Sequence, residues 1–251
     1  MHRRYIDALL ALAAVLLLAA CGSAKSQLGS PTSTTRPDNG VAAKTAADIL
    51  GDAQRALRNA RGVHVVGTLL SQSDAITMDI RLGAGRGHGT VKAEGARLEV
   101  LAVNGHTYIR GKKFWRKVGT DDGNARLGDQ LANLIGERWV LLSGRRAANP
   151  LVGAAKALVD LRTFADQVFA DVERARLVKG TRGTVNGQPA FSVDDRQGWL
   201  LWVATTGPPF PLRIEAKPGS AAEGKVDFQE YGIAVQVQEP ADALDTSKLP
   251  G

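Results

Sequence analysis

Ala75-Ile-Thr-Met-Asp-Ile-Arg-Leu82 sets the fold class, because apolar and polar residues alternate along it without interruption. A period of two is typical of a β-strand with one buried and one solvated face. Stretches of the same kind surround it: Val63 to Leu70, Gly89 to Ala93, Arg97 to Val103 and His106 to Arg110. The strand pattern is expected to end at Val118. Asn104-Gly105 predicts a two-residue hairpin turn, so the first half of the chain predicts an antiparallel sheet.

Helical spacing precedes and interrupts these strands. Thr45 is the expected N-cap of a helix from Ala46 to Ala60, and residues 124–137 and 150–171 carry further helical patterns. Strands resume near residue 176 and end with residues 233–237, giving about ten in all. We therefore predict an α+β domain, a large curved antiparallel sheet (half-barrel) with helices covering its concave face.

A second Asn-Gly turn occurs at Asn186-Gly187, at a hairpin position that matches Asn104-Gly105. An internal duplication explains this, and so does the general frequency of Asn-Gly in tight hairpins. The glycine-rich stretch 83–89 is followed by a strand and not by a helix, which favours a hairpin connection over a phosphate loop. Asp121-Asp122 and Asp194-Asp195 are interpreted as turns and not as calcium sites.

The N-terminus carries an export signal. Residues 8–20 form an apolar run after a basic start, too short to span a bilayer comfortably but suited to a signal-peptide core. The run ends in Leu18-Ala-Ala-Cys21, which resembles the lipobox of bacterial lipoproteins. That resemblance implies cleavage before Cys21 and lipid on its thiol, whereas an ordinary cleaved signal and an uncleaved anchor are the alternatives. Cys21 is the only cysteine, so no disulfide forms within the chain.

Composition then divides the chain into three parts. Residues 1–20 are the expected signal peptide, residues 21–42 the lipidated cysteine and a flexible tether rich in Ser, Thr, Pro and Gly, and residues 43–251 the folded domain. Localisation follows: the protein is expected on the extracytoplasmic face of the cell membrane, held by lipid. For an exported chain, the net charge of +7 favours an anionic membrane surface as the partner. A nucleic-acid partner is not expected.

Motifs for catalysis are scarce. The four histidines have no metal-type spacing, and neither Gly-x-Ser-x-Gly nor Ser-x-x-Lys occurs. We expect no enzyme activity, no metal and no cofactor. The most distinctive charged feature is a basic stretch with aromatic residues, in which five residues are assigned to membrane and head-group contact: Lys112, Lys113, Trp115, Arg116 and Lys117. Its alternative is a solvated hairpin with one aromatic residue in the core.

The layout of an initial helix, meandering strands, inserted helices and closing strands resembles the LolA-like superfamily. Within it, the sequence is similar to the LppX/LprAFG family of mycobacterial lipid-binding lipoproteins. The resemblance rests on the lipobox Leu18 to Cys21, the tether, the helix at Ala46, Val103 to Ile109 with Trp115, and residues 199–216. It implies a cavity for the acyl chains of a membrane lipid or glycolipid, non-catalytic carriage across the cell envelope, and a transporter that loads or receives lipid.

Seven residues are expected to line that cavity, all on the buried face of their strands: Ile76, Met78, Ile80, Leu82, Leu98, Val100 and Val235. Burial of each methylene group contributes about 0.8 kcal/mol, so an apolar cavity is sufficient to bind an acyl chain. The competing interpretation is an interaction or scaffold lipoprotein of a cell-envelope complex with a filled core. A pocket in the range of about 300–1,000 Å³ favours the carrier, and a filled interior favours the scaffold.

Overall fold

The computed structural model describes residues 37–70, 75–93, 95–121, 125–143, 155, 157–170, 172–217, 220 and 223–245. The expected signal peptide, Cys21 and most of the expected tether lie outside these residues. Within them, no helix is long and apolar enough to cross a membrane.

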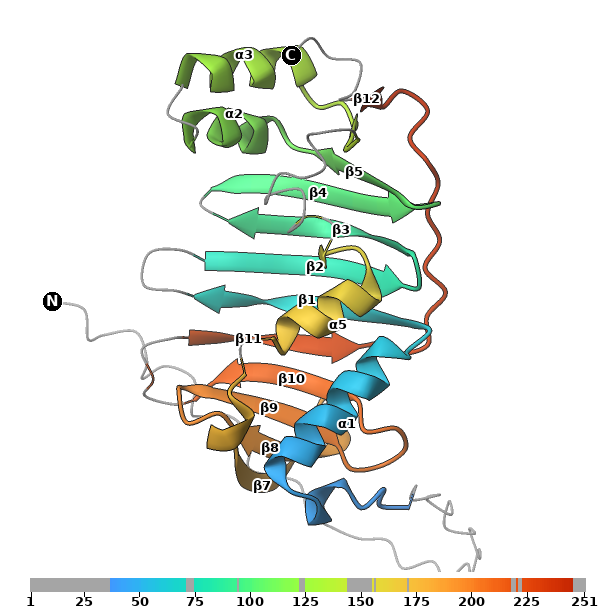
Figure 1. The fold of residues 1–251 in the computed structure, drawn as a ribbon, viewed down its shortest axis with the longest axis vertical. Coiled ribbons are helices and arrows are strands. Elements are labelled where there is room, and N and C mark those ends of the chain that lie inside the picture. Colours follow the sequence, from blue (N-terminus) through green and yellow to red (C-terminus); the bar gives the residue numbers. More distant parts are fainter. Residues whose placement is uncertain are drawn as a thin grey trace, which may run out of the picture. The chain divides into compact units, whose positions relative to one another are not determined.

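One sheet organises the described chain (Figure 1). Its twelve strands have the order β12-β6-β5-β4-β3-β2-β1-β11-β10-β9-β8-β7, and neighbours are antiparallel except for β12 and β6. The first half of the chain supplies β1 (Gly62–Leu70), β2 (Ala75–Gly83), β3 (Arg86–Ala93), β4 (Ala96–Val103), β5 (His106–Arg110) and β6 (Val140–Leu141). The second half supplies β7 (Val178–Val185), β8 (Gln188–Asp194), β9 (Trp199–Ala204), β10 (Pro211–Ala216), β11 (Glu223–Gln229) and β12 (Leu244–Asp245). The α+β fold class predicted from the sequence is confirmed.

The two halves of the sheet join where β1 pairs with β11. Each half is a meander of hairpins, and the last long strand of the second half returns to the first strand of the first half. Seven residue pairs connect the two strands, among them Val65 with Phe228 and Gly67 with Val226. A β-carbon on Gly67 would lie 2.2 Å from the carbonyl oxygen of Lys225, so glycine permits the close approach of the strands here.

Both Asn-Gly turns form as predicted. Asn104 and Gly105 have φ angles of 53° and 80°, and Asn186 and Gly187 have φ angles of 49° and 79°. Two successive left-handed residues are the requirement of a type I′ turn, which matches the twist of the flanking strands. The turns therefore fix the register of β4 with β5 and of β7 with β8.

Helices α1 (Ala46–Arg58) and α5 (Leu161–Val168) lie over the same face of the sheet, which we call the helix-covered face (Figure 1). Thr45 caps α1 by accepting a hydrogen bond from the Asp48 amide, as the sequence predicts. Asp160 caps α5 by accepting from the Thr163 amide at 2.8 Å. Helices α2 (Lys112–Asp121) and α3 (Ala125–Ile135) follow β5, and the short 3-10 helices η1 (Val41–Ala43) and η3 (Arg174–Arg176) complete the described helices.

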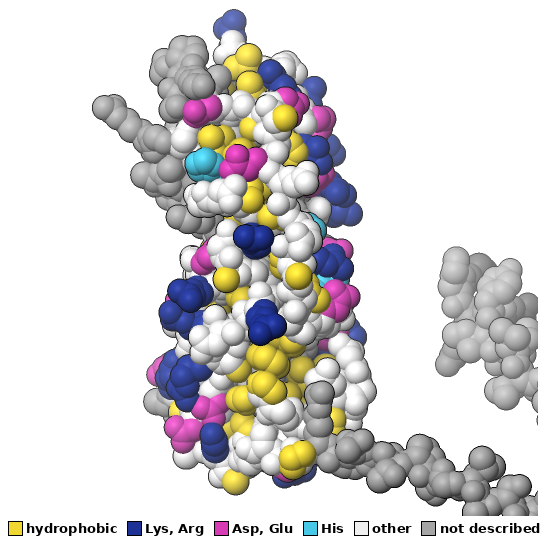
Figure 2. Space-filling model, turned by 90° about the vertical axis from the view of Figure 1, so that its right-hand side faces the viewer, with side chains coloured by type: hydrophobic (Ala, Val, Ile, Leu, Met, Phe, Trp, Pro, Cys, Tyr) yellow, Lys and Arg dark blue, Asp and Glu magenta, His cyan; other side chains and the backbone are white. Residues whose placement is uncertain are grey.

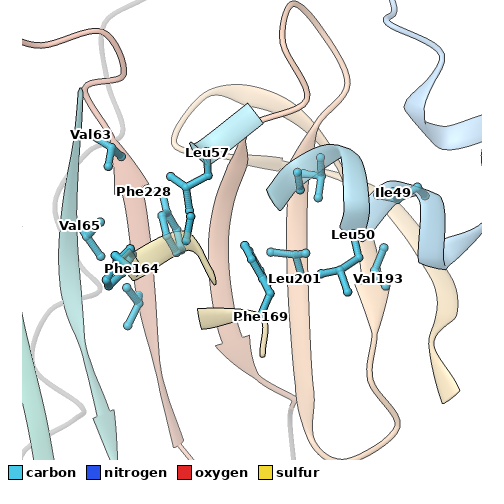
Figure 3. Packing of buried hydrophobic residues seen from close by; sticks show 14 of the residues in the cluster. Ile49, Leu50, Leu57, Val63, Val65, Phe164, Phe169, Val193, Leu201 and Phe228 are labelled. Carbon is cyan, nitrogen blue, oxygen red and sulfur yellow. The ribbon is translucent and has the colours of Figure 1, made fainter. Parts of the chain in front are cut away.

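Two hydrophobic cores stabilise this layer of helices. In the larger one, Leu50 and Leu57 of α1 and Phe164 of α5 pack on strand residues such as Val65 and Phe228 (Figure 3). The smaller core joins β4, β5 and β6 to α3 through buried residues that include Val100, Ile109, Ile135 and Val140. Val41 is also buried in the larger core, although it falls in the segment expected to be a tether.

Two sequence predictions are wrong in detail. Residues 112–118 form a helix and not the end of a hairpin, because the helical turn allows Phe114 and Trp115 to pack on the smaller core. Residues 233–237 form no strand, although they alternate. The preceding strand β11 already has β1 and β10 on its two edges, so the segment cannot pair with β11 as a hairpin.

Candidate functional site

Residue register places one row of side chains across eight neighbouring strands on the helix-covered face. Each member pairs directly with the next, and we call this set the apolar row: Val193, Leu201, Ile214, Val226, Gly67, Met78, Val91 and Leu98. Val193, Leu201 and Val226 are buried, whereas Ile214, Met78, Val91 and Leu98 are half-buried. The row therefore passes from a covered region over β8 to β11 to a more accessible region over β2 to β4.

A half-enclosed pocket of about 170 Å³ lies at the covered end of the apolar row. Its walls are Leu50 of α1, Phe169 at the end of α5, and the row members Val193, Leu201 and Ile214. Figure 3 shows Leu50 and Phe169 directed towards Val193 and Leu201. The remaining walls are Val168, Val172, Leu177, Asp195, Trp199 and Leu200, so the lining is apolar except for one carboxylate.

That carboxylate does not make the pocket polar. Asp195 Oδ1 accepts hydrogen bonds from the backbone amides of Gln197, Gly198 and Trp199 at 2.8, 3.1 and 2.9 Å. Asp195 thus closes the turn between β8 and β9, which is the role predicted from the sequence. The pocket is suited to a hydrocarbon group.

The seven residues expected to line a cavity do not share one environment. Ile80, Leu82 and Val100 are fully buried members of the two cores, and Met78 and Leu98 are half-buried in the apolar row. Ile76 is 37% exposed. Val235 is buried outside the strands, where its side chain lies against Gly83. Register does bring Met78 and Ile80 of β2 onto the helix-covered face with Leu98 and Val100 of β4.

Sequence patterns did not identify several of the residues that line the pocket. Val172, Leu177 and Trp199 come from separate segments that meet only through the strand order and through the placement of α5 and η3. The alternation of β9 and β10 marks Leu201 and Ile214 as inward residues, but nothing local shows that a space remains beside them. Packing, and not a motif, creates this site.

The basic aromatic stretch lies on α2. Phe114 and Trp115 pack on the smaller core, and the Trp115 indole N–H is buried without a hydrogen-bond partner among the described residues. Arg116 pairs with Asp129 of α3 at 2.8 Å, while Lys113 is exposed and Lys112 is half-buried. Helix α3 adds Leu134, which is 54% exposed. This end of the sheet thus combines basic side chains with an exposed apolar one.

The face opposite the helices carries several polar pairs, and at β7 to β10 it also bears a third apolar cluster that includes Val185, Ala190 and Ala204. His64 Nε2 donates a hydrogen bond to Asp79 at 2.7 Å, and its Nδ1 lies 3.2 Å from the Gln229 amide nitrogen. Arg213 pairs with Asp227 on two neighbouring strands at 2.5 Å. Charged side chains lie along both margins of the view in Figure 2. Among the described residues no group of three metal-ligating side chains occurs.

Neither a comparison with protein-family models nor one with curated protein sequences finds a match. The fold is similar to solved structures. LprF from Mycobacterium bovis is 15% identical, with 78% of this chain and 97% of that chain covered and a TM-score of 0.46. LppX from Mycobacterium tuberculosis is 11% identical, with 77% and 98% covered and a TM-score of 0.45. A LolA superfamily protein from Nitrosomonas europaea is 10% identical, with 77% and 96% covered and a TM-score of 0.27.

Proposed function

We propose that this chain is a membrane-anchored lipoprotein that binds an acyl chain of a lipid or glycolipid on the helix-covered face and carries it across the cell envelope without chemistry. The observation that carries the proposal is the apolar pocket between α1, α5 and strands β8 to β10. A dry apolar cavity of about 150 Å³ holds one benzene molecule, so a pocket of about 170 Å³ holds a hydrocarbon segment of about six carbons. Burial of six methylenes contributes about 5 kcal/mol before ordering costs.

The rest of a longer chain follows the apolar row. From Ile214 to Leu98 the row crosses five strand-to-strand steps of about 4.8 Å, which is on the order of 24 Å. This is enough for one acyl chain, because two chains end to end span a bilayer core of about 30 Å. Met78, Val91 and Leu98 are half-buried and receive the end of the chain closest to solvent. Binding of a complete acyl chain requires α5 to move away from Val226 and Phe228.

Anchoring and docking complete the proposal. Lipid on Cys21 holds the protein on the extracytoplasmic face of the membrane. Lys112 and Lys113 on α2, together with exposed Leu134 on α3, contact anionic head groups while a lipid enters or leaves. A transporter that supplies or accepts the lipid is the expected partner.

The test is the lipid content of the full-length protein. We expect mass spectrometry of the protein purified from its membrane to find non-covalent acyl lipid in a defined ratio, beyond the lipid attached to Cys21. A delipidated sample should bind a fluorescent fatty acid saturably. The control is a matched purification of an unrelated lipoprotein, which corrects for lipid carried over by detergent.

One observation favours a second function, that of a scaffold lipoprotein. Ile80 and Leu82 are completely buried beneath the helices, so the centre of the sheet is filled by the protein's own side chains. Absence of non-covalent lipid, together with no saturable uptake of the fatty acid, would establish this alternative.

A further inference from the structure

We propose that the face opposite the helices carries a binding groove for a neutral carbohydrate. The groove has a volume of about 350 Å³, within the range of about 300–1,000 Å³ of ordinary ligand sites. Its floor is formed by β3 and β4, and one wall is the C-terminal segment 236–238. It lies on the other side of the sheet from the apolar pocket, so the two sites are independent.

Register shows that the floor belongs to the polar face. His88 pairs with Leu101 and Thr90 pairs with Glu99, and these four residues alternate with the residues of β3 and β4 that face the helices. Trp139, just before β6, and the exposed residues Gln236 and Gln238 also line the groove. The remaining lining residues are Gly89, Val100 and Val237. The groove therefore combines one aromatic ring with five groups that form hydrogen bonds.

Several of these groups have unused hydrogen-bonding capacity. Among the described residues, neither the Gln236 and Gln238 amides nor the Trp139 indole N–H has a hydrogen-bond partner. Each glutamine amide offers two donors and one acceptor. The Thr90 hydroxyl accepts from Arg97 at 3.3 Å and keeps its own O–H as a donor. Donors and acceptors are thus mixed along the groove, as a ligand with many hydroxyl groups requires.

The charges in the groove are already balanced or suppressed. Glu99 is paired with Arg110 through one oxygen and with Arg97 through the other, the latter at 3.3 Å. Burial and the nearby charge of Arg81 lower the pKa of His88, so its imidazole is neutral at neutral pH and both donates and accepts. A neutral ligand therefore fits better than an ionic one.

Trp139 supplies the aromatic ring of the groove. The Arg110 guanidinium lies 4.6 Å from the centre of the indole ring and fixes its orientation. A pyranose ring presents C–H groups on its faces and hydroxyl groups around its rim. An aromatic ring surrounded by amides and hydroxyls matches that pattern, whereas an acyl chain would leave the polar groups of the groove unpaired.

The glycan could be free in solution or part of a lipid head group, and two probes separate these sources. The first is a panel of tetrasaccharides of glucose, mannose, galactose and arabinose, titrated into the full-length protein and followed by saturation-transfer NMR. The second is a set of phosphatidylcholine vesicles with and without digalactosyldiacylglycerol. We expect saturable binding of at least one tetrasaccharide, or of glycolipid vesicles above the plain vesicles.

Variants locate the binding. Gln236→Ala combined with Gln238→Ala removes two exposed side chains and should weaken binding by about tenfold or more, since each hydrogen bond contributes about 1 kcal/mol and about 1.4 kcal/mol is a factor of ten. Trp139→Ala should abolish binding, and Trp139→Phe should restore part of it by returning the aromatic ring. Gln188→Ala, at an exposed glutamine of β8, is the matched control and should bind like the parent.

Two results would overturn the proposal. One is that the parent binds neither the tetrasaccharides nor the glycolipid above the plain vesicles. The other is that the double glutamine variant, which needs no change in the core, binds as well as Gln188→Ala. Neither result would bear on the proposed lipid site in the apolar pocket, because fatty-acid uptake is measured separately.

Discussion

Ile214→Trp is expected to remove bound lipid while the fold survives. Ile214 is half-buried, lines the pocket and pairs with Leu201 and Val226 in the apolar row. A tryptophan here has about 170 Å³ of neighbouring space to occupy. It therefore avoids most of the overpacking cost of about 1–3 kcal/mol that a filled core imposes.

The size of the effect follows from the hydrocarbon that the indole displaces. Excluding only two methylenes costs about 1.6 kcal/mol, which exceeds the 1.4 kcal/mol that corresponds to about a tenfold change in affinity. We expect at least a tenfold weaker affinity for a fluorescent fatty acid. The melting temperature of the lipid-free variant should stay within about 3 °C of the lipid-free parent. The comparison must use lipid-free protein, because bound lipid itself raises the apparent stability.

Two further tryptophan variants serve as controls. Val66→Trp adds the same bulk on the opposite face, where Val66 pairs with Asp79 and Asp227, and should leave fatty-acid binding unchanged. Ile80→Trp enters a filled core in which a β-carbon on Gly89 would already lie 2.5 Å from Ile80, and should destabilise the protein. A folded Ile214→Trp protein that binds fatty acid as the parent does would refute the pocket as the lipid site.

Three other changes have defined outcomes. Cys21→Ala should abolish incorporation of a fatty-acid label and leave unprocessed or released protein; label at the parental level would contradict the lipobox assignment. Lys112→Ser with Lys113→Ser should weaken binding to anionic vesicles by about thirtyfold at low salt, since each charge contributes about 1 kcal/mol near the surface, and vesicle binding that is equal at all salt concentrations would show that these lysines are merely solvated. The lowered pKa of His88 means that the unfolded chain binds a proton more readily than the folded chain, so this residue's contribution to stability is complete above pH 6.5 and decreases as the pH falls below it. His88→Gln should therefore flatten the decrease in melting temperature between about pH 6.5 and 5, and an unchanged slope would assign that decrease to other groups.

Local patterns were sufficient for most of the strands. The alternation of residues 75–82 and the Asn104-Gly105 turn fix both an inward face and a register, since each depends on neighbours in sequence. Helix α1 could be predicted equally well, because its cap and its apolar face lie within one short segment. These features required no knowledge of the rest of the chain.

Features that depend on contacts between distant residues could not be predicted from the sequence. The alternation of residues 233–237 matches a strand, but β11 has no free edge for it, so Val235 is buried against Gly83 instead. Residues 112–118 were expected to continue the strand pattern, but the contact of Phe114 and Trp115 with the smaller core favours a helix. The pocket depends on how α5 and η3 settle over β8 to β10, which no local pattern contains.

The pairing of β1 with β11, which we call the seam, also determines the order in which parts of the sheet can fold. Gln229 follows His64 by 165 residues, yet the two side chains touch across this seam. A chain that is synthesised from its N-terminus can form the hairpins β1 to β5 early, but β1 keeps an unpaired edge until nearly the whole chain has been made. Contacts so remote in sequence form slowly, and an open strand edge invites pairing with another molecule. The risk of aggregation is therefore greatest after β1 has formed and before β11 pairs with it, and slower synthesis of the residues between these two strands should increase aggregation.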